Sequence, residues 1–226
     1  MTWRLLAVPA LITLGVTALR LYGELQRWSP ALFRREPGGV GAIVGIIWLA
    51  PLFGAYFAVR LVKRGAGPAS PGKALARAGA GMGLLMASGL VTVLLWPPFK
   101  VQVVVVAVVA AVAVALQFPA WPALIKTLLL YAVAARVPVV ALMFLAIKGG
   151  WGTHYDAFPP GFPLTEPFER WLWGGLAVQM TLWVGNTVLL GALAGSIAAR
   201  LMSAGRSGRV SAPRTDVQGA PSRSSL

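Results

Sequence analysis

The 226-residue chain has no cysteine, a single histidine and only six acidic residues. Without cysteine it can form no disulfide, no thiolate nucleophile and no cysteine-ligated zinc or iron–sulfur centre. One histidine argues against a bis-histidine haem or a histidine-based zinc site. The sequence also lacks the G-x-S-x-G and HExxH motifs of two common hydrolase classes. We therefore expect no metal and no cofactor.

Charge of either sign is scarce, whereas apolar residues are abundant. Charged residues make up 12% of the chain and apolar residues 58%, and the mean hydropathy is +0.75. Soluble domains contain about 25% charged residues, so this composition is typical of a membrane protein. A membrane-crossing helix needs roughly 20 mostly apolar residues.

Six apolar segments are long enough, or nearly so, to be helical spans. The fourth is short and rich in valine, but an isolated strand cannot satisfy its backbone in lipid, so we predict a helix there. The first could be a cleaved signal peptide, but its length suits a retained span and no soluble domain follows it. The sequence thus predicts an all-α integral membrane protein, a bundle of about six transmembrane helices over residues 3–22, 40–62, 74–96, 101–118, 123–147 and 171–201.

The net charge of +14 indicates topology rather than nucleic-acid binding, because the basic residues lie between and after the apolar runs. With the N-terminus inside, twelve Lys and Arg residues are cytoplasmic and seven lie outside. We expect both termini in the cytoplasm, an aromatic, proline-rich outer loop at 148–170, and a disordered basic tail at 202–226. Arginine accounts for 15 of the 20 basic residues, which favours a GC-rich bacterial source and hence the cytoplasmic (inner) membrane of a bacterium.

Arg136 lies near the middle of the fifth segment, where a charge is costly and requires a partner. Three partners are open: the carbonyl freed by Pro138, the amide of Asn186, or an anionic ligand. Gln179 and Asn186 are seven residues apart, about two α-helical turns, so they should share one face of the sixth helix. We favour a structural role for Arg136, with a ligand site formed by Arg136, Asn186 and Gln179 as the alternative.

Small residues at spacings of four give two helices faces suited to close packing. Gly191 and Gly195 lie on the sixth segment, and Gly79 and Gly83 lie on the third. Such faces contact neighbouring helices or a protein partner. Separately, Pro51 and Pro138 fall near the middle of the second and fifth segments, and proline-interrupted helices at matching positions indicate a transporter site.

Polar residues of the outer side form two groups. Arg20, Glu24 and Arg27 are spaced for one helix face and predict an interfacial charge ladder. His154 and Asp156 lie in the loop "WGTHYDAFPPGF" and could form an acid–base pair. We regard them as weak catalytic candidates, because the aromatic and proline content of the loop favours a rigid interfacial cap.

Three functions remain open from sequence. We favour a non-catalytic structural or accessory membrane subunit, which contacts the lipid bilayer and a partner protein through its small-residue faces. The alternative is a carrier or channel for a small anionic solute, which requires Arg136 to line a cavity. The third is an interfacial enzyme acting on lipid-linked substrates, which requires His154, Asp156 and another polar group such as Glu24 to converge.

Overall fold

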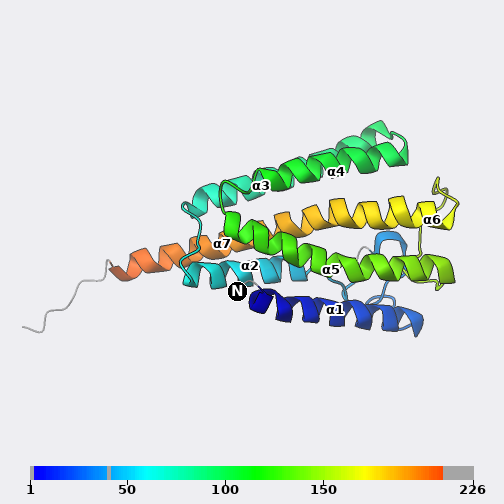
Figure 1. Cartoon of the computed structure of the whole chain (residues 1–226), viewed down its shortest axis with the longest axis horizontal. Helices are drawn as coiled ribbons and strands as arrows, with labels where there is room; N and C mark the ends of the chain where they lie inside the picture. The colour runs from blue at the N-terminus through cyan, green and yellow to red at the C-terminus, as the bar shows by residue number, and fades with distance from the viewer. Residues whose placement is uncertain (1–2, 40–41, 211–226) are drawn as a thin grey trace, which may run out of the picture.

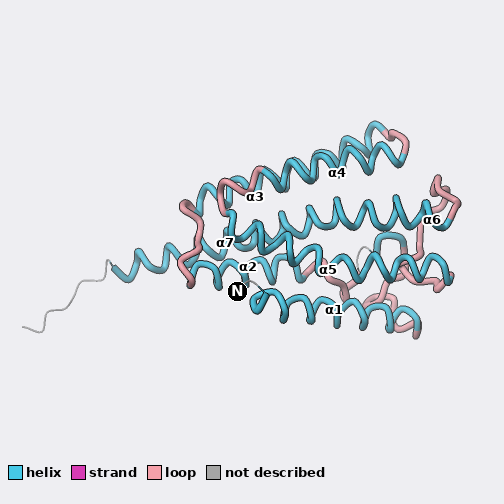
Figure 2. Tube along the Cα trace, in the orientation of Figure 1, coloured by secondary structure: helices cyan, strands magenta, loops and turns pink. Residues whose placement is uncertain are grey.

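The computed structural model describes residues 3–39 and 42–210, and these form helices joined by turns, without a strand among them (Figure 2). This confirms the all-α prediction. The helices are α1 (Trp3–Leu25), η1 (Pro37–Gly39), α2 (Leu49–Lys63), α3 (Pro71–Leu95), α4 (Phe99–Ala115), α5 (Pro122–Gly149), α6 (Pro167–Glu169), η2 (Arg170–Ala177), η3 (Gln179–Trp183) and α7 (Val184–Val210).

Within the described residues, four helices are long and apolar enough to cross a membrane, as expected of a helical membrane protein. They cover Arg4–Leu25, Pro71–Leu95, Pro122–Gly149 and Pro167–Gly205. The apolar helix α4 is shorter, at 17 residues. Helix α2 has only 15 residues. The first apolar segment, 3–22, falls within helix α1 (Trp3–Leu25).

Helix α7 lies at the centre of the bundle, where it contacts α2, α3, α4 and α5 (Figure 1). Its glycines make the closest approach. A Cβ on Gly54 of α2 would collide with the backbone of Gly191, and a Cβ on Gly195 would lie 2.9 Å from the Gly54 carbonyl oxygen. The Gly191–Gly195 face is therefore a packing seam inside the chain. By contrast, Gly79 and Gly83 of α3 are exposed, and a Cβ there would meet nothing within 4 Å.

This seam gives the first testable prediction. We expect Gly54→Ala to lower the free energy of unfolding by about 2 kcal/mol, because the new methyl group must displace backbone rather than a flexible side chain. Gly15→Ala is the control, since a Cβ there meets nothing within 4 Å. It should stabilise α1 by about 0.5–1 kcal/mol through helix propensity. Equal melting temperatures for the two variants would contradict this packing.

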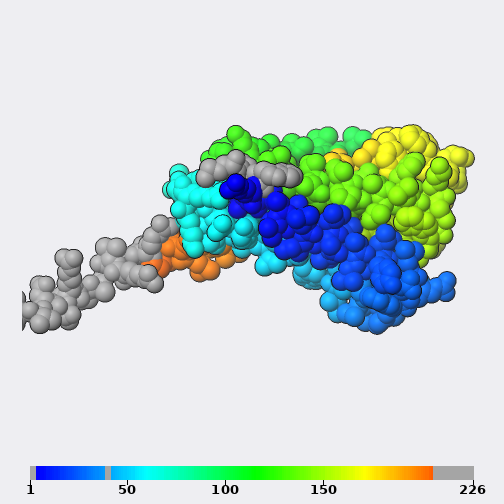
Figure 3. Space-filling model, turned by 60° about the horizontal axis from the view of Figure 1, so that its bottom comes forward, coloured from blue at the N-terminus to red at the C-terminus, as the bar shows by residue number. Residues whose placement is uncertain are grey.

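The second predicted span, 40–62, needs correction. Helix α2 begins at Leu49, and residues 42–48 are irregular. Pro51 lies in the first turn of α2, where its missing N–H costs nothing, so it begins a helix and does not interrupt one. Figure 3 shows the segment after α1 gathered at one end of the molecule. Residues 42–48 therefore lead into α2 without helical structure.

The sixth predicted span also differs from the structure. Its helix begins at Pro167 and contains two π-helical stretches, Arg170–Ala177 and Gln179–Trp183, before it continues as α7 to Val210. The predicted tail at 202–226 is therefore wrong for its first nine residues, because the good helix formers around Leu201 extend the last turns of α7. The remaining part of that tail lies outside the described residues.

The two ends of the bundle differ in charge. One end carries the start of α1, the α2–α3 connection and the end of α7 (Figure 1). Arg60 and Lys63 lie there, in the last turn of α2. The other end carries the end of α1 and the connection 150–166 between α5 and α6 (Figure 1). Glu24 and Asp156 lie at this second end.

Candidate functional site: a basic cavity

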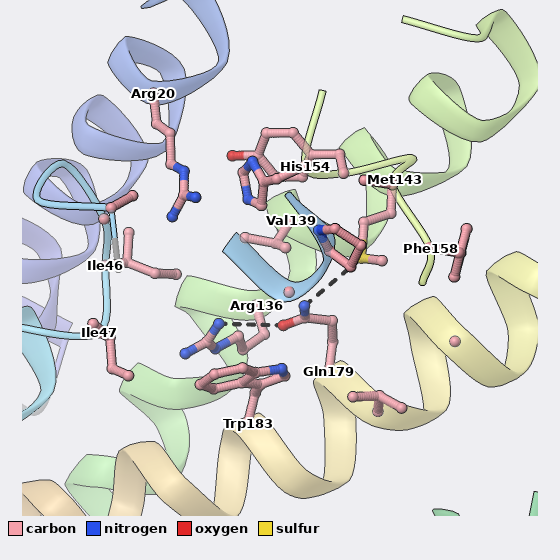
Figure 4. Close-up of a pocket in the computed structure, with 18 of the residues that line it drawn as sticks. Arg20, Ile46, Ile47, Arg136, Val139, Met143, His154, Phe158, Gln179 and Trp183 are labelled. Atoms are coloured by element: carbon pink, nitrogen blue, oxygen red, sulfur yellow. Dashed lines mark hydrogen bonds between the residues drawn. The ribbon is translucent and has the colours of Figure 1, made fainter. Parts of the chain in front are cut away.

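A cavity of about 600 Å³ lies toward the end that carries the connection 150–166. Its walls come from α1, the irregular segment 42–48, α5, the connection itself and the π-helical residues before α7. Within the irregular segment, Ala42, Gly45, Ile46, Ile47 and Trp48 line this cavity. Three basic side chains face this space: Arg20, Arg136 and His154 (Figure 4).

Arg136 reaches the cavity from α5 and is incompletely bonded. Its side chain is buried, with only 6% of the residue exposed. One terminal nitrogen donates to Gln179 Oε1 at 3.2 Å and the other to Thr187 Oγ1 at 3.3 Å. The guanidinium also lies over the Trp183 ring, 5.1 Å from its centroid. Nε is buried and has no hydrogen-bond partner among the described residues. Both hydrogen bonds are long, and neither acceptor carries charge.

The polar partner of Arg136 on α7 is Thr187, which corrects the predicted Asn186. Residues seven apart share a face only in an unbroken α-helix. Gln179–Trp183 is π-helical, with hydrogen bonds from i to i+5 and wider turns. Because the π-helical turn holds more residues, the helix face that carries Gln179 recurs after eight residues rather than seven. Thr187, and not Asn186, therefore lies on the same face as Gln179. Pro138 lies inside α5 as predicted, but the Arg136 bonds run to side chains of the neighbouring helix.

A buried carboxylate connects α1 to the connection 150–166. The Glu24 side chain is 0% exposed, and its oxygens accept hydrogen bonds from Arg20 Nε at 2.8 Å and from the His154 backbone N–H at 2.9 Å. The His154 ring also faces it, with Nδ1 at 2.6 Å from one oxygen and 2.7 Å from the other. The charge of Glu24 is thus compensated within the group Arg20–Glu24–His154.

This geometry orients the His154 ring. A carboxylate can only accept hydrogen bonds, so Nδ1 carries the proton toward Glu24. In a neutral ring, Nε2 is then left as an acceptor. Burial lowers the pKa of His154 from its usual 6.5, opposed by the hydrogen bond to Glu24, while the nearby Arg20 lowers it further. The ring is therefore neutral at pH 7.

Asp156 does not serve as the partner of His154, which corrects the predicted pair. Its carboxylate accepts from the backbone N–H groups of Gly152 and Thr153, both at 2.8 Å, and from Thr153 Oγ1 at 2.7 Å. Such bonds to a nearby backbone close a turn. Asp156 shapes the loop, and Glu24 holds the histidine. The enzymatic role proposed for His154 and Asp156 stays untested.

Arg27 is separate from the other two members of the predicted ladder. Helix α1 ends at Leu25, and Arg27 has a left-handed φ of 53° beyond that end. The N–H groups of Arg27 and Trp28 close the helix on the carbonyls of Glu24 and Gly23. Glu24 is buried, because the connection 150–166 folds onto it, so the three residues of the predicted interfacial ladder do not share one environment.

The remaining cavity wall is apolar and largely aromatic. Phe158 and Phe162 stack with centroids 4.6 Å apart, and Phe99 meets Phe162 edge-on at 4.8 Å. Gly174 of η2 makes room for this stack, since a Cβ there would lie 2.7 Å from Phe158. Trp48 also lines the cavity. The predicted cap thus forms a cavity wall and does more than cover the interface.

The site suits binding of an anion rather than of a metal. The described part of the chain holds no group of three His, Cys, Asp or Glu residues that could ligate a metal ion. Because Glu24 is compensated, Arg136 leaves the cavity with an excess positive charge. Sequence reasoning missed Thr187, Trp183 and Tyr155 as neighbours of this charge. Only the change of helical register and the folding of the loop bring them there.

Neither a family model, nor a curated protein sequence, nor a solved structure matches this chain.

Proposed function

We propose that this protein is a multi-pass bacterial inner-membrane protein that binds a small amphipathic anion in the basic cavity and carries it across the membrane. In this proposal the two short helices α2 and α4 also lie within the membrane, giving six segments with both termini cytoplasmic. The excess of basic residues at the end that carries the start of α1 and the end of α7 supports that orientation. The cavity then opens toward the outer side.

The observation that carries the proposal is the incomplete pairing of Arg136. A buried arginine without an acidic partner is costly. Within the described residues, Arg136 Nε is buried and has no hydrogen-bond acceptor, and Arg136 lines the cavity of about 600 Å³. An anion bound beside it would supply the missing acceptor and the missing charge. A purely structural arginine would be expected to saturate its five donors with protein acceptors.

The apolar wall supports an amphipathic ligand over a simple inorganic anion. Ligand sites are typically clefts of about 300–1,000 Å³ that are mostly apolar with a few polar groups. Here the polar groups are Arg20, Arg136 and His154, and the phenylalanines Phe158 and Phe162 form an apolar wall. Each buried methylene group of a ligand contributes about 0.8 kcal/mol. A short alkyl or aryl tail should therefore add substantially to the affinity.

The backbone around the cavity supports transport. Carriers often place their sites at discontinuous helices. The irregular residues 42–48 before α2 form one such break, and the π-helical residues of η2 and η3 form a second. Segments of π-helix are frequent at functional sites. Both breaks line the same cavity.

The proposal is tested by thermal unfolding of the purified protein in a neutral detergent with three ligands. Hexanesulfonate is an amphipathic anion, sulfate lacks the tail, and hexanesulfonamide lacks the charge. We expect hexanesulfonate alone to raise the melting temperature, with about 2.7 kcal/mol of stabilisation at 100 times its dissociation constant.

Transport is then measured as uptake of radiolabelled hexanesulfonate into liposomes that contain the protein. Uptake above that of protein-free liposomes is expected. Equal responses to hexanesulfonate and hexanesulfonamide would show that the site does not select charge, and the proposal would be abandoned.

A second candidate is the accessory membrane subunit favoured by the sequence. The exposed Gly79 and Gly83 of α3 support it, since a helix of a partner protein could approach this face closely. This candidate requires no ligand in the basic cavity. Absence of stabilisation by all three compounds would place it ahead of the carrier.

A further inference from the structure

His154, which lines the basic cavity, bonds to Glu24 through one ring nitrogen, Nδ1. The other ring nitrogen, Nε2, has no hydrogen bond to a described residue. Nδ1 lies 2.6–2.7 Å from the two oxygens of Glu24, which also accepts from Arg20 and from the His154 backbone. The two ring nitrogens lie on different sides of an imidazole. Nε2 is therefore directed away from Glu24, on a residue that lines the cavity.

The protonation state of the ring decides what Nε2 can bind. With Nδ1–H donated to a carboxylate, a neutral ring leaves Nε2 as an acceptor, which repels an anionic oxygen. A ring that carries a second proton donates from both nitrogens. An anion that accepts a hydrogen bond from His154 can therefore do so only after the ring has gained a proton.

We propose that binding of an anion in the basic cavity is coupled to the uptake of one proton by His154, so that the protein carries the anion together with a proton. This inference rests on the proposed function. During transport, this coupling would make the movement of a singly charged anion electrically neutral, because one proton moves with each anion. The proton gradient would then drive the transport. Glu24 would hold the protonated ring in place throughout.

The charged groups around His154 support the uptake of the proton by this residue rather than by a neighbour. Glu24 and Arg20 face it from α1, and Asp156 lies two residues along its own loop with its carboxylate bonded to Gly152 and Thr153. Arg136 of α5 lines the same cavity, and the Tyr155 ring lies beside the His154 ring, tilted by 43° with centroids 3.9 Å apart. Guanidinium groups do not titrate near neutrality, and burial raises the pKa of Tyr155. His154 is the group of this set whose ordinary pKa lies nearest neutrality.

The ligand changes the balance at the ring. In the ligand-free protein, burial and Arg20 hold the pKa of His154 below its usual value, so the ring is neutral at pH 7. An anion at Nε2 adds a negative charge and an acceptor beside the ring, and both favour the protonated form. By linkage, the same coupling makes anion binding weaker as the pH rises.

The experiment is a calorimetric titration of the detergent-solubilised protein with hexanesulfonate at about pH 7.5, in two buffers with different enthalpies of ionisation. Hexanesulfonate stays singly charged over this pH range, so any proton taken up goes to the protein. We expect the observed enthalpies to differ by the amount that corresponds to about one proton per bound anion. The affinity should fall by about tenfold for each unit of pH increase above neutrality.

His154→Gln is the diagnostic variant, because its amide can donate to the anion without titrating. We expect it to bind hexanesulfonate with the same enthalpy in both buffers and with little dependence on pH. If this variant does not fold, the wild-type titration still tests the coupling, because binding without proton uptake would overturn it.

The outcomes separate this inference from the proposed function. Binding with no proton uptake by the wild-type protein would overturn the coupling and leave the anion site standing. Uptake of one proton by both the wild type and His154→Gln would assign the proton to another group and also overturn it. Failure of the wild type to bind hexanesulfonate at all would overturn the proposed function and, with it, this inference.

Discussion

Replacing Arg136 with leucine is expected to abolish stabilisation of the protein by hexanesulfonate while leaving the ligand-free protein folded. Removing one partner of a buried charge pair typically costs about 2–5 kcal/mol, so the affinity should fall by more than about 30-fold. The ligand-free protein should change by less than about 1 kcal/mol, because the two hydrogen bonds lost are long and the desolvation cost of the guanidinium disappears with them. Thermal unfolding with and without ligand measures both quantities.

Two further variants make this experiment specific. Arg34→Leu removes one positive charge from the same end of the bundle at an exposed position, so it should leave the ligand response unchanged. Arg136→Lys keeps the positive charge but loses the planar guanidinium group with its five N–H donors, and an intermediate loss of affinity is expected. If Arg136→Leu instead unfolds early while its response to hexanesulfonate persists, then Arg136 holds the helices together and the anion binds elsewhere.

Replacing Glu24 with alanine is expected to give the largest loss of stability. Its carboxylate joins α1 to a loop 130 residues later in the chain and accepts from Arg20, the His154 backbone and the His154 ring. Removing one partner of a buried ionic group costs about 3–5 kcal/mol, because the remaining groups lose the carboxylate while they stay buried. The free energy of unfolding, measured by denaturant titration in detergent, should fall by this amount.

The matched control is Glu36→Ala. Glu36 also pairs with an arginine, Arg34, but at 3.4 Å and with 65% of its side chain exposed. Its loss should cost less than about 1 kcal/mol. Glu24→Gln keeps acceptor capacity without the charge and should lie between the two. A Glu24→Ala protein that unfolds like Glu36→Ala would mean that the connection 150–166 is held to the bundle by its apolar contacts alone.

Some of the candidate site was accessible from the sequence. Arg136 could be recognised because its distance from both ends of an apolar segment places it at mid-bilayer, whatever the neighbouring helices do. Gln179 was selected by its spacing of seven residues from Asn186. That spacing argument does not hold for Asn186, because the assumption of a regular α-helix fails where Gln179–Trp183 adopts the π-helical form. Nothing in that stretch of sequence indicates the wider turns.

The pairing of His154 shows the other limit. Asp156 is nearer in sequence and was the natural candidate, but neighbouring loop residues bond most easily to their own backbone, and Asp156 does so. Glu24 becomes the partner because the connection after α5 folds onto the end of α1. That approach depends on how α1 and α5 pack, which no local pattern encodes.

By itself, the sequence determined the helical class, the membrane-like hydropathy and the approximate positions of the long helices. These follow from composition and from the lengths of apolar runs, which are local properties of the chain. Only the tertiary structure decided that residues 42–48 are irregular, that Glu24 is buried, and that Arg20, Arg136 and His154 face one cavity. The reason is physical: a cavity and a buried ion pair arise from contacts between segments far apart in sequence, and their free energies depend on packing rather than on local preference.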